Sequence, residues 1–215
     1  MILLTITAIL LIVFLANYFL YLILFLKTER KRSKAWDNYT KLYLILWIAP
    51  LILIPLITSS ILALFFGTIS YFQDSWLWFI LLGIILIIVG VKFVKSAQDV
   101  NKIQGYAKGK HQLITVGVFK IMRHPNYFAW AIIFLGLALI LDSLIALLLT
   151  PFIVLFLEFG GYLEEKYIII PQFGEDYIKY KETTRWRLFS TPYNYLFLII
   201  SIFIIWVGVL NFYVN

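Results

Sequence analysis

Long apolar runs separated by short polar segments dominate the chain. These runs cover approximately residues 2–26, 42–66, 76–94, 125–141, 143–163 and 194–213. A helix rises 1.5 Å per residue, so about 20 residues cross the roughly 30 Å of hydrocarbon in a bilayer. The pattern therefore predicts an all-α, polytopic integral membrane protein with about six transmembrane helices.

The amino-acid composition agrees with a membrane protein and excludes several kinds of site. Of the 215 residues, 63% are hydrophobic and 13% are charged, whereas soluble domains average about 45–50% and about 25%. The absence of cysteine excludes disulfides, thiolate nucleophiles and cysteine-based metal centres. The two histidines, His111 and His124, are too few for a histidine-rich metal site. We therefore expect no metal.

The formal net charge of +7 is distributed unevenly along the chain. All 18 basic residues fall within the stretches 27–41, 92–123 and 166–187. With six spans these stretches share one side of the membrane, which the positive-inside rule makes cytoplasmic, and both termini lie outside. The charge thus indicates orientation rather than nucleic-acid binding, in the plasma membrane of a prokaryote or the endoplasmic reticulum of a eukaryote.

A helical hairpin is predicted between the two longest polar segments. Pro125 suits the first turn of a helix, where its missing N–H costs nothing. A turn at Asp142-Ser143 sends the chain back. Because the two helices are of similar length, we expect Arg123-His124 and Glu164-Glu165 to lie side by side at the cytoplasmic end.

The position of the paired glutamates at a helix C-terminus needs a physical explanation. A helix C-terminus favours cations, so two adjacent carboxylates there are mildly unfavourable. Glu158 lies deeper in the same helix and is costlier unless it faces the interior of the bundle. The carboxylates either meet a cationic ligand, or they solvate the helix end and pair with Arg123 or Lys166. The residues alone leave both interpretations open.

The motifs between about residues 90 and 190 resemble, in order and spacing, the isoprenylcysteine carboxyl methyltransferase family and, more loosely, the membrane phospholipid methyltransferases. The motifs are Leu113-Ile114-Thr115, Gly117-Val118-Phe119, Arg123-His124-Pro125-Asn126-Tyr127, Glu164-Glu165 and Phe173-Gly174-Glu175-Asp176-Tyr177-Ile178-Lys179-Tyr180. The resemblance divides a single membrane domain, residues 1–215, into anchoring spans (1–90), a methyltransferase-like core (91–190) and a C-terminal span (194–213).

The resemblance implies a cytoplasmic pocket for S-adenosyl-L-methionine and an acceptor that enters from the bilayer. We expect Arg123 and Glu164 at the reacting end of the site, and snorkelling to interfacial phosphate is the competing role for Arg123. The positions implied in cofactor binding are Gln104, His111, Gln112, Leu113, Ile114, Phe119, His124, Pro125, Asn126, Tyr127 and Glu165. Carboxylates and aromatic faces suit the sulfonium and ammonium groups of this cofactor.

Two positions depart from the pattern of the carboxyl methyltransferases. Phe119 stands where the family often has tyrosine, so the ring is kept and the hydroxyl is lost. Gly161 stands where the family has an arginine that meets the substrate. We therefore expect no guanidinium at that place to hold a prenylcysteine carboxylate. The expected function is methyl transfer to a lipid-like or small apolar acceptor.

An alternative is an NADPH-dependent sterol-type reductase of the membrane, which is similar in an Asn-Tyr helix start and a Gly-x-x-Tyr-x-x-Tyr tail. Its dinucleotide phosphates would favour basic residues where this chain has Glu164-Glu165. A helical bundle without enzymatic activity is a third possibility. It would not account for the long polar segments.

Overall fold

The described part of the chain consists of helices and short connecting segments. The computed structural model describes residues 2–27, 34–59, 76–100 and 113–189, together with residues 195, 198–200, 202, 203 and 206. The main helices are α1 (Ile2–Lys27), α2 (Lys34–Ile57), α4 (Trp76–Val100), α5 (Pro125–Ile140), α6 (Leu144–Glu164), α7 (Ile170–Phe173) and α8 (Glu175–Thr183). No strand occurs in these residues, which confirms the prediction of an all-α chain.

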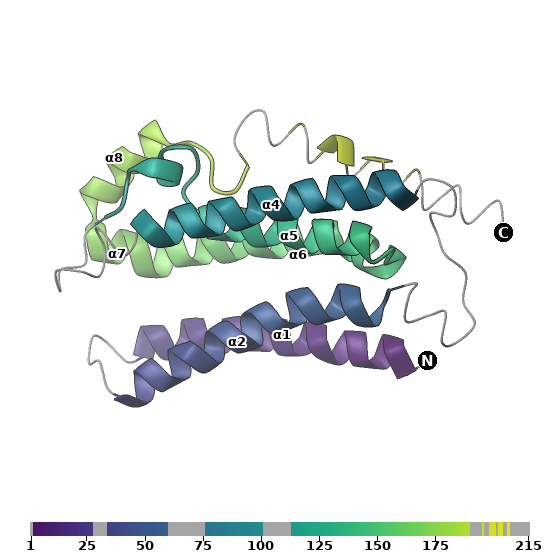
Figure 1. Cartoon of the computed structure of the whole chain (residues 1–215). Helices are drawn as coiled ribbons and strands as arrows, with labels where there is room; N and C mark the ends of the chain where they lie inside the picture. The colour runs from purple at the N-terminus through teal and green to yellow at the C-terminus, as the bar shows by residue number, and fades with distance from the viewer. Residues whose placement is uncertain are drawn as a thin grey trace.

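The long helices pack in two groups. Helices α4, α5 and α6 lie side by side, while α1 and α2 form a pair beside them (Figure 1). Helix α2 contacts both α5 and α6, and Tyr18 on α1 donates a 2.6 Å hydrogen bond to the carbonyl of Gly160 on α6. The short helices α7 and α8 follow the end of α6 (Figure 1).

Helices α4 and α5 approach each other closely because each has a glycine at the crossing. A Cβ atom on Gly83 would lie 2.6 Å from the carbonyl oxygen of Gly136, and one on Gly136 would lie 2.8 Å from that of Gly83. Small residues at a crossing allow two helix backbones to touch, which is the usual packing of membrane helices. The crossing holds α5 firmly against α4.

Two described helices are long and apolar enough to cross a membrane, Leu77–Val100 and Leu144–Phe173. Three others are apolar but shorter in the described residues, Thr5–Tyr21, Ile45–Ile57 and Pro125–Ile140. Large apolar side chains on the long helices are exposed, such as Trp78 at 73% and Phe152 at 68%. The arrangement with six spans stays a prediction, and most of its last span, 194–213, lies outside the described residues.

The predicted hairpin is confirmed, with one difference in length. Helix α5 begins at Pro125, and the turn before α6 places Asp142 at φ 49° and Ser143 at the N-cap. At the other end the helix does not stop at Glu164-Glu165. A π-helical turn, Glu165–Ile169, leads directly into α7, and the helix ends at Gly174 with φ 54°. The glutamates therefore project from the side of a continuing helix.

Candidate functional site

The segment after α8, residues 184–189, crosses the start of α5 and fixes its two polar residues. The backbone N–H of Arg123 donates to the carbonyl of Trp186 at 3.0 Å, and that of His124 donates to the carbonyl of Arg187 at 2.9 Å. This segment is called the tail below. It brings residues that are about 60 positions apart into one layer over the open end of the α5–α6 hairpin.

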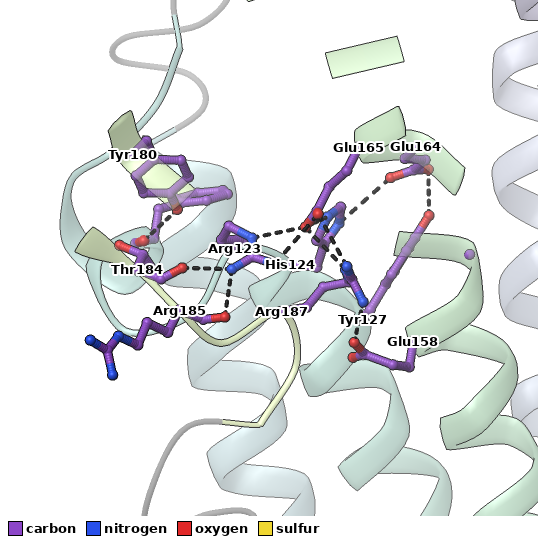
Figure 2. A network of polar contacts seen from close by, with 12 residues as sticks. Arg123, His124, Tyr127, Glu158, Glu164, Glu165, Tyr180, Thr184, Arg185 and Arg187 are labelled. Atoms are coloured by element: carbon purple, nitrogen blue, oxygen red, sulfur yellow. Dashed lines mark hydrogen bonds and ion pairs between the residues drawn. The ribbon is translucent and has the colours of Figure 1, made fainter. Parts of the chain in front are cut away.

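Glu165 is the centre of the polar cluster (Figure 2). Arg123 donates from Nε to Glu165 Oε1 at 2.8 Å and from Nη2 to Oε2 at 3.4 Å. Arg187 donates from Nε to Oε1 at 3.1 Å and from Nη2 to Oε2 at 3.2 Å. Two guanidinium groups thus bind the same carboxylate in the two-pronged geometry that arginine favours.

The Arg123 side chain is fully engaged inside the protein. Its Nη1 donates to the carbonyls of Thr184 at 2.6 Å and Arg185 at 2.7 Å. The side chains of Arg123 and Glu165 are 3% and 2% exposed. A buried charge needs both a counter-ion and hydrogen bonds, and this pair has them. Arg123 therefore holds the tail and Glu165 together.

Glu164 lies beside Glu165 but meets different groups. One carboxylate oxygen accepts from the Tyr127 hydroxyl, and the other lies 3.6 Å from His124 Nδ1. The Nε2 atom of His124 lies 3.3 Å from Glu165 Oε1, so the imidazole sits between the two carboxylates. The side chain of Glu164 is 20% exposed. No arginine or lysine is paired with this carboxylate within the described residues.

An aromatic wall adjoins Glu164. The rings of His124 and Tyr127 stack at 5.4 Å, and Trp47 on α2 lies 5.5 Å from Tyr127 and 6.2 Å from Trp130. Trp47 is buried, and its indole N–H has no hydrogen-bond partner within the described part of the chain. Ring faces next to a carboxylate form a suitable environment for an organic cation.

An arginine from another segment lies beside Gly161, where the sequence led us to expect none, and its guanidinium is paired with Glu158 and Glu165. Arg187 reaches this place from the tail: a Cβ atom added to Gly161 would lie 2.7 Å from Arg187 Cδ and 3.2 Å from its Cγ. From there Arg187 Nη1 also pairs with Glu158. Glycine leaves space on α6, and the arginine stem of another segment fills it.

The structure brings together part of the predicted cofactor set and the two residues predicted for the reacting end. His124, Pro125, Asn126, Tyr127, Glu164 and Glu165 lie at the open end of the hairpin with Arg123. Phe119 is linked to α8, because its carbonyl accepts a 2.5 Å hydrogen bond from the hydroxyl of Tyr180. Gln104, His111 and Gln112 lie outside the described residues.

Leu113 lies near the short helices, and Ile114, the next residue, is half-buried. Leu113 lines an open pocket together with Thr115, Phe173, Asp176, Lys179, Tyr180 and Thr183. Neither glutamate of the cluster lines this pocket. Tyr180, which also binds Phe119, therefore connects the pocket to the segment that leads into the cluster.

Sequence reasoning missed Trp47, Tyr180 and above all Arg187. Arg187 was visible as one of two arginines in Arg185-Trp186-Arg187, but a surface cation and a buried one look alike in sequence. The available signal was the glycine pair Gly160-Gly161. Glycine on a helix face beside carboxylates leaves space that a long side chain from another segment can fill. Trp47 lies far from the motifs in sequence and reaches them through the packing of α2.

Burial and charge set the protonation of the groups around the tail. Burial alone would lower the pKa of Arg187, but its hydrogen bond to Glu165 and the charges of Glu165 and Glu158 raise the pKa above the ordinary value. Burial also raises the pKa of Tyr177, and the Glu165 carboxylate adds to this. Arg187 therefore stays charged and Tyr177 stays neutral under physiological conditions.

The described residues contain no group of three or more histidine, cysteine or acidic side chains placed to hold a metal ion. The cluster instead combines acidic, basic and aromatic groups at the end of a membrane-type helical hairpin. Such a site is suited to binding a charged organic ligand at the edge of an apolar bundle.

Residues 78–176 match the family model of phospholipid methyltransferase. The match extends from α4 through the hairpin to the start of α8, and it confirms the resemblance to the membrane phospholipid methyltransferases. This match supports a methyltransferase, and the two long apolar helices support a membrane protein. Neither the curated proteins nor the solved structures gave a match. Nothing in these comparisons supports a sterol-type reductase.

Proposed function

We propose that the protein transfers a methyl group from S-adenosyl-L-methionine to a lipid-like or small apolar acceptor, in the manner of the isoprenylcysteine carboxyl methyltransferases. The observation that supports this is the position of Glu164, which lies against the His124 and Tyr127 rings without a paired arginine or lysine among the described residues. A cationic ligand would complete that arrangement. The proposal extends to six spans, with the site on the cytoplasmic side.

The residues present fit the cofactor by their chemistry. When bound, S-adenosyl-L-methionine would supply an electrophilic methyl group on a sulfonium and carry an ammonium on the same chain. Glu164 offers a carboxylate to such a cation, while His124 and Tyr127 offer ring faces. The site is partly buried, which strengthens these electrostatic contacts relative to water.

The proposed cofactor set follows the resemblance except that Glu164, rather than Glu165, is the carboxylate proposed to meet the cofactor. Glu165 and Arg123 are saturated by each other and by the tail, which favours a holding role for both. Glu164, with its exposed portion, is placed to meet ligand. For an amine acceptor, it would also be the group that accepts the proton released as the new carbon–nitrogen bond forms.

Catalysis would then depend on alignment and on the exclusion of water. Methyl transfer needs the acceptor atom in line with the methyl–sulfur bond, and held reactants gain much of the barrier reduction through orientation. The packed hairpin, fixed by the α4–α5 crossing and by the tail, supplies a rigid frame for this. The exposed apolar side chains of α6 would face the acyl chains of the bilayer, from which a lipid-like acceptor would approach.

Ligand-induced stabilisation tests the proposal directly. The full chain, purified in detergent, is heated with S-adenosyl-L-methionine, with S-adenosyl-L-homocysteine or with NADPH. A ligand present at 100 times its Kd stabilises the folded state by about 2.7 kcal/mol. We expect both methionine-derived ligands to raise Tm and NADPH to leave it unchanged. Stabilisation by NADPH alone would contradict the proposal.

The acceptor is then identified with methyl-labelled cofactor in membranes that contain the protein. Prenylcysteine, phospholipid amines and small apolar thiols are offered in parallel, and the labelled product is isolated. A carboxylate acceptor is worth including because Arg187 does bring a guanidinium to Gly161. Formation of labelled product in membranes without the protein, at equal rate, would show that the activity has another source.

A further inference from the structure

Arg187 occupies the place of a side chain that α6 lacks. Residues three before and four after a helical position lie on the same face, and for Gly161 these are Glu158 and Glu165. The guanidinium of Arg187 pairs with both of these glutamates. An arginine carried by position 161 itself would reach the same two carboxylates, because the Arg187 stem passes where its Cβ would be.

The two arginines balance two of the three acidic groups. Arg123 and Arg187 pair with Glu165, and Arg187 also pairs with Glu158. Glu164 is the acidic group left beside them, and it meets a hydroxyl and an imidazole. Without Arg187, Glu158 would lose its cation, and Glu165 would depend on Arg123 alone. The negative charge would then be spread over the cluster rather than concentrated at Glu164.

Stability alone is a weak reason for this arrangement. Buried triads of charged residues are often no more stabilising than apolar side chains of similar volume. A bulky apolar residue at 161 would fill the same gap within α6 and would need no help from the tail. The chain instead combines glycine on α6 with an arginine that also brings the tail across His124.

We infer that Arg187 is a positioning residue for ligand binding. From the tail it supplies the guanidinium that Gly161 cannot. By pairing with Glu165, it gives the two adjacent glutamates different roles. Glu165 becomes part of the scaffold, and Glu164 becomes the acidic group that meets a cationic ligand. This inference rests on the proposed function. It also adds a residue from beyond the segment 78–176 that the family model matches.

Four forms of the full chain test the inference: the wild type, Arg187→Ala, the double variant Gly161→Arg/Arg187→Ala and its matched control Gly161→Ala/Arg187→Ala. The two double variants both fill the gap on α6, and they differ in whether a guanidinium returns. Two quantities are measured for each in detergent, the Tm without ligand and the Kd of S-adenosyl-L-homocysteine.

We expect Arg187→Ala and the alanine double variant to bind at least about tenfold more weakly, which corresponds to 1.4 kcal/mol. The arginine double variant should recover most of the affinity. An Arg187→Ala protein with unchanged Kd would overturn the inference. So would an arginine double variant that regains Tm without regaining affinity, because Arg187 would then have a structural role alone.

The design separates failure of this inference from failure of the proposed function. If the wild type binds neither S-adenosyl-L-homocysteine nor S-adenosyl-L-methionine, both the proposed function and the ligand role of Arg187 are wrong. If the wild type binds and Arg187→Ala does not fold, the two double variants still decide. Equal affinity of those two would overturn the inference, and recovery by the arginine variant alone would support it.

Discussion

The two ends of the α5–α6 hairpin are built on different principles. At the turn end, Ser143 caps α6 by accepting from the N–H of Ala146 at 3.2 Å, and its hydroxyl lies 2.5 Å from that of Thr58. At the open end, two arginines, a histidine and three glutamates come from three separate segments. The turn end is closed by a local cap and one hydroxyl contact with Thr58, whereas the open end depends on charges from distant parts of the chain.

The turn end has what the fold needs, whereas the open end has charges that the fold does not need and a ligand can use. A cap and a hydroxyl pair suffice to reverse the chain between two helices. The open end removes Arg123 and Glu165 almost completely from solvent, and this desolvation is expensive even when the pairing is good. A hairpin does not require such a cluster. Its presence at one end alone is consistent with a site that binds charged molecules.

We expect the largest loss of stability from Glu165→Ala, which removes the central carboxylate at the open end of the hairpin. Removing this carboxylate leaves the buried Arg123 without its counter-ion, and Arg187 keeps Glu158 alone. Leaving a buried charge unpaired costs about 3–5 kcal/mol. Thermal or chemical unfolding in detergent measures the loss. Glu175→Ala, at an exposed position on α8, is the control and should change little. A loss below about 1 kcal/mol for Glu165→Ala would show that the cluster is not essential for the fold.

The next effect separates the two neighbouring glutamates. Glu164→Gln keeps a group that can bond to the Tyr127 hydroxyl but removes the charge. Since no arginine or lysine pairs with Glu164 among the described residues, we expect the unfolding free energy to change by less than about 1 kcal/mol. The affinity for S-adenosyl-L-homocysteine should fall by roughly tenfold. Isothermal calorimetry measures it, with exposed Glu182→Gln as the control. A large loss of stability without a change in affinity would reverse the assigned roles.

The turn end and the start of α5 could be predicted because their signals are local. Pro125 marks the first turn of a helix, and Asp142-Ser143 combines a residue that tolerates positive φ with a capping hydroxyl. The proximity of Arg123-His124 to Glu164-Glu165 could also be predicted from the sequence, because two helices of similar length in a hairpin bring their ends together. These inferences need spacing and residue type alone.

The tail could not be predicted because its position is set by tertiary contacts. Nothing in the pattern indicates that the N–H groups of Arg123 and His124 would bond to the carbonyls of Trp186 and Arg187. The continuation of the helix past Glu165 was missed for a related reason. Adjacent carboxylates disfavour a helix end, but they are compatible with a continuing helix once cations from another segment neutralise them.

A smaller effect is expected at the turn end. Ser143→Ala removes the side-chain acceptor for Ala146 and the hydroxyl contact with Thr58. Loss of an N-cap costs about 1 kcal/mol. Unfolding measurements should show this loss while the affinity for S-adenosyl-L-homocysteine stays at the wild-type value. If Ser143→Ala weakened binding as much as Glu164→Gln, the two ends of the hairpin would not be separable.

The smallest effect is expected from Arg185→Ala, and it distinguishes the backbone of the tail from its charge. Arg185 and Arg187 are two residues apart, yet Arg185 is exposed and its side chain points away from the cluster (Figure 2). Its contribution to the site is its carbonyl, which accepts from Arg123 and survives the substitution. Exposed substitutions usually change stability by less than about 0.5 kcal/mol, and we expect both Tm and ligand affinity to stay near wild type. If Arg185→Ala weakened binding as strongly as Arg187→Ala, the total positive charge of the tail would control the site. The specific place of one guanidinium above Gly161 would then be unimportant.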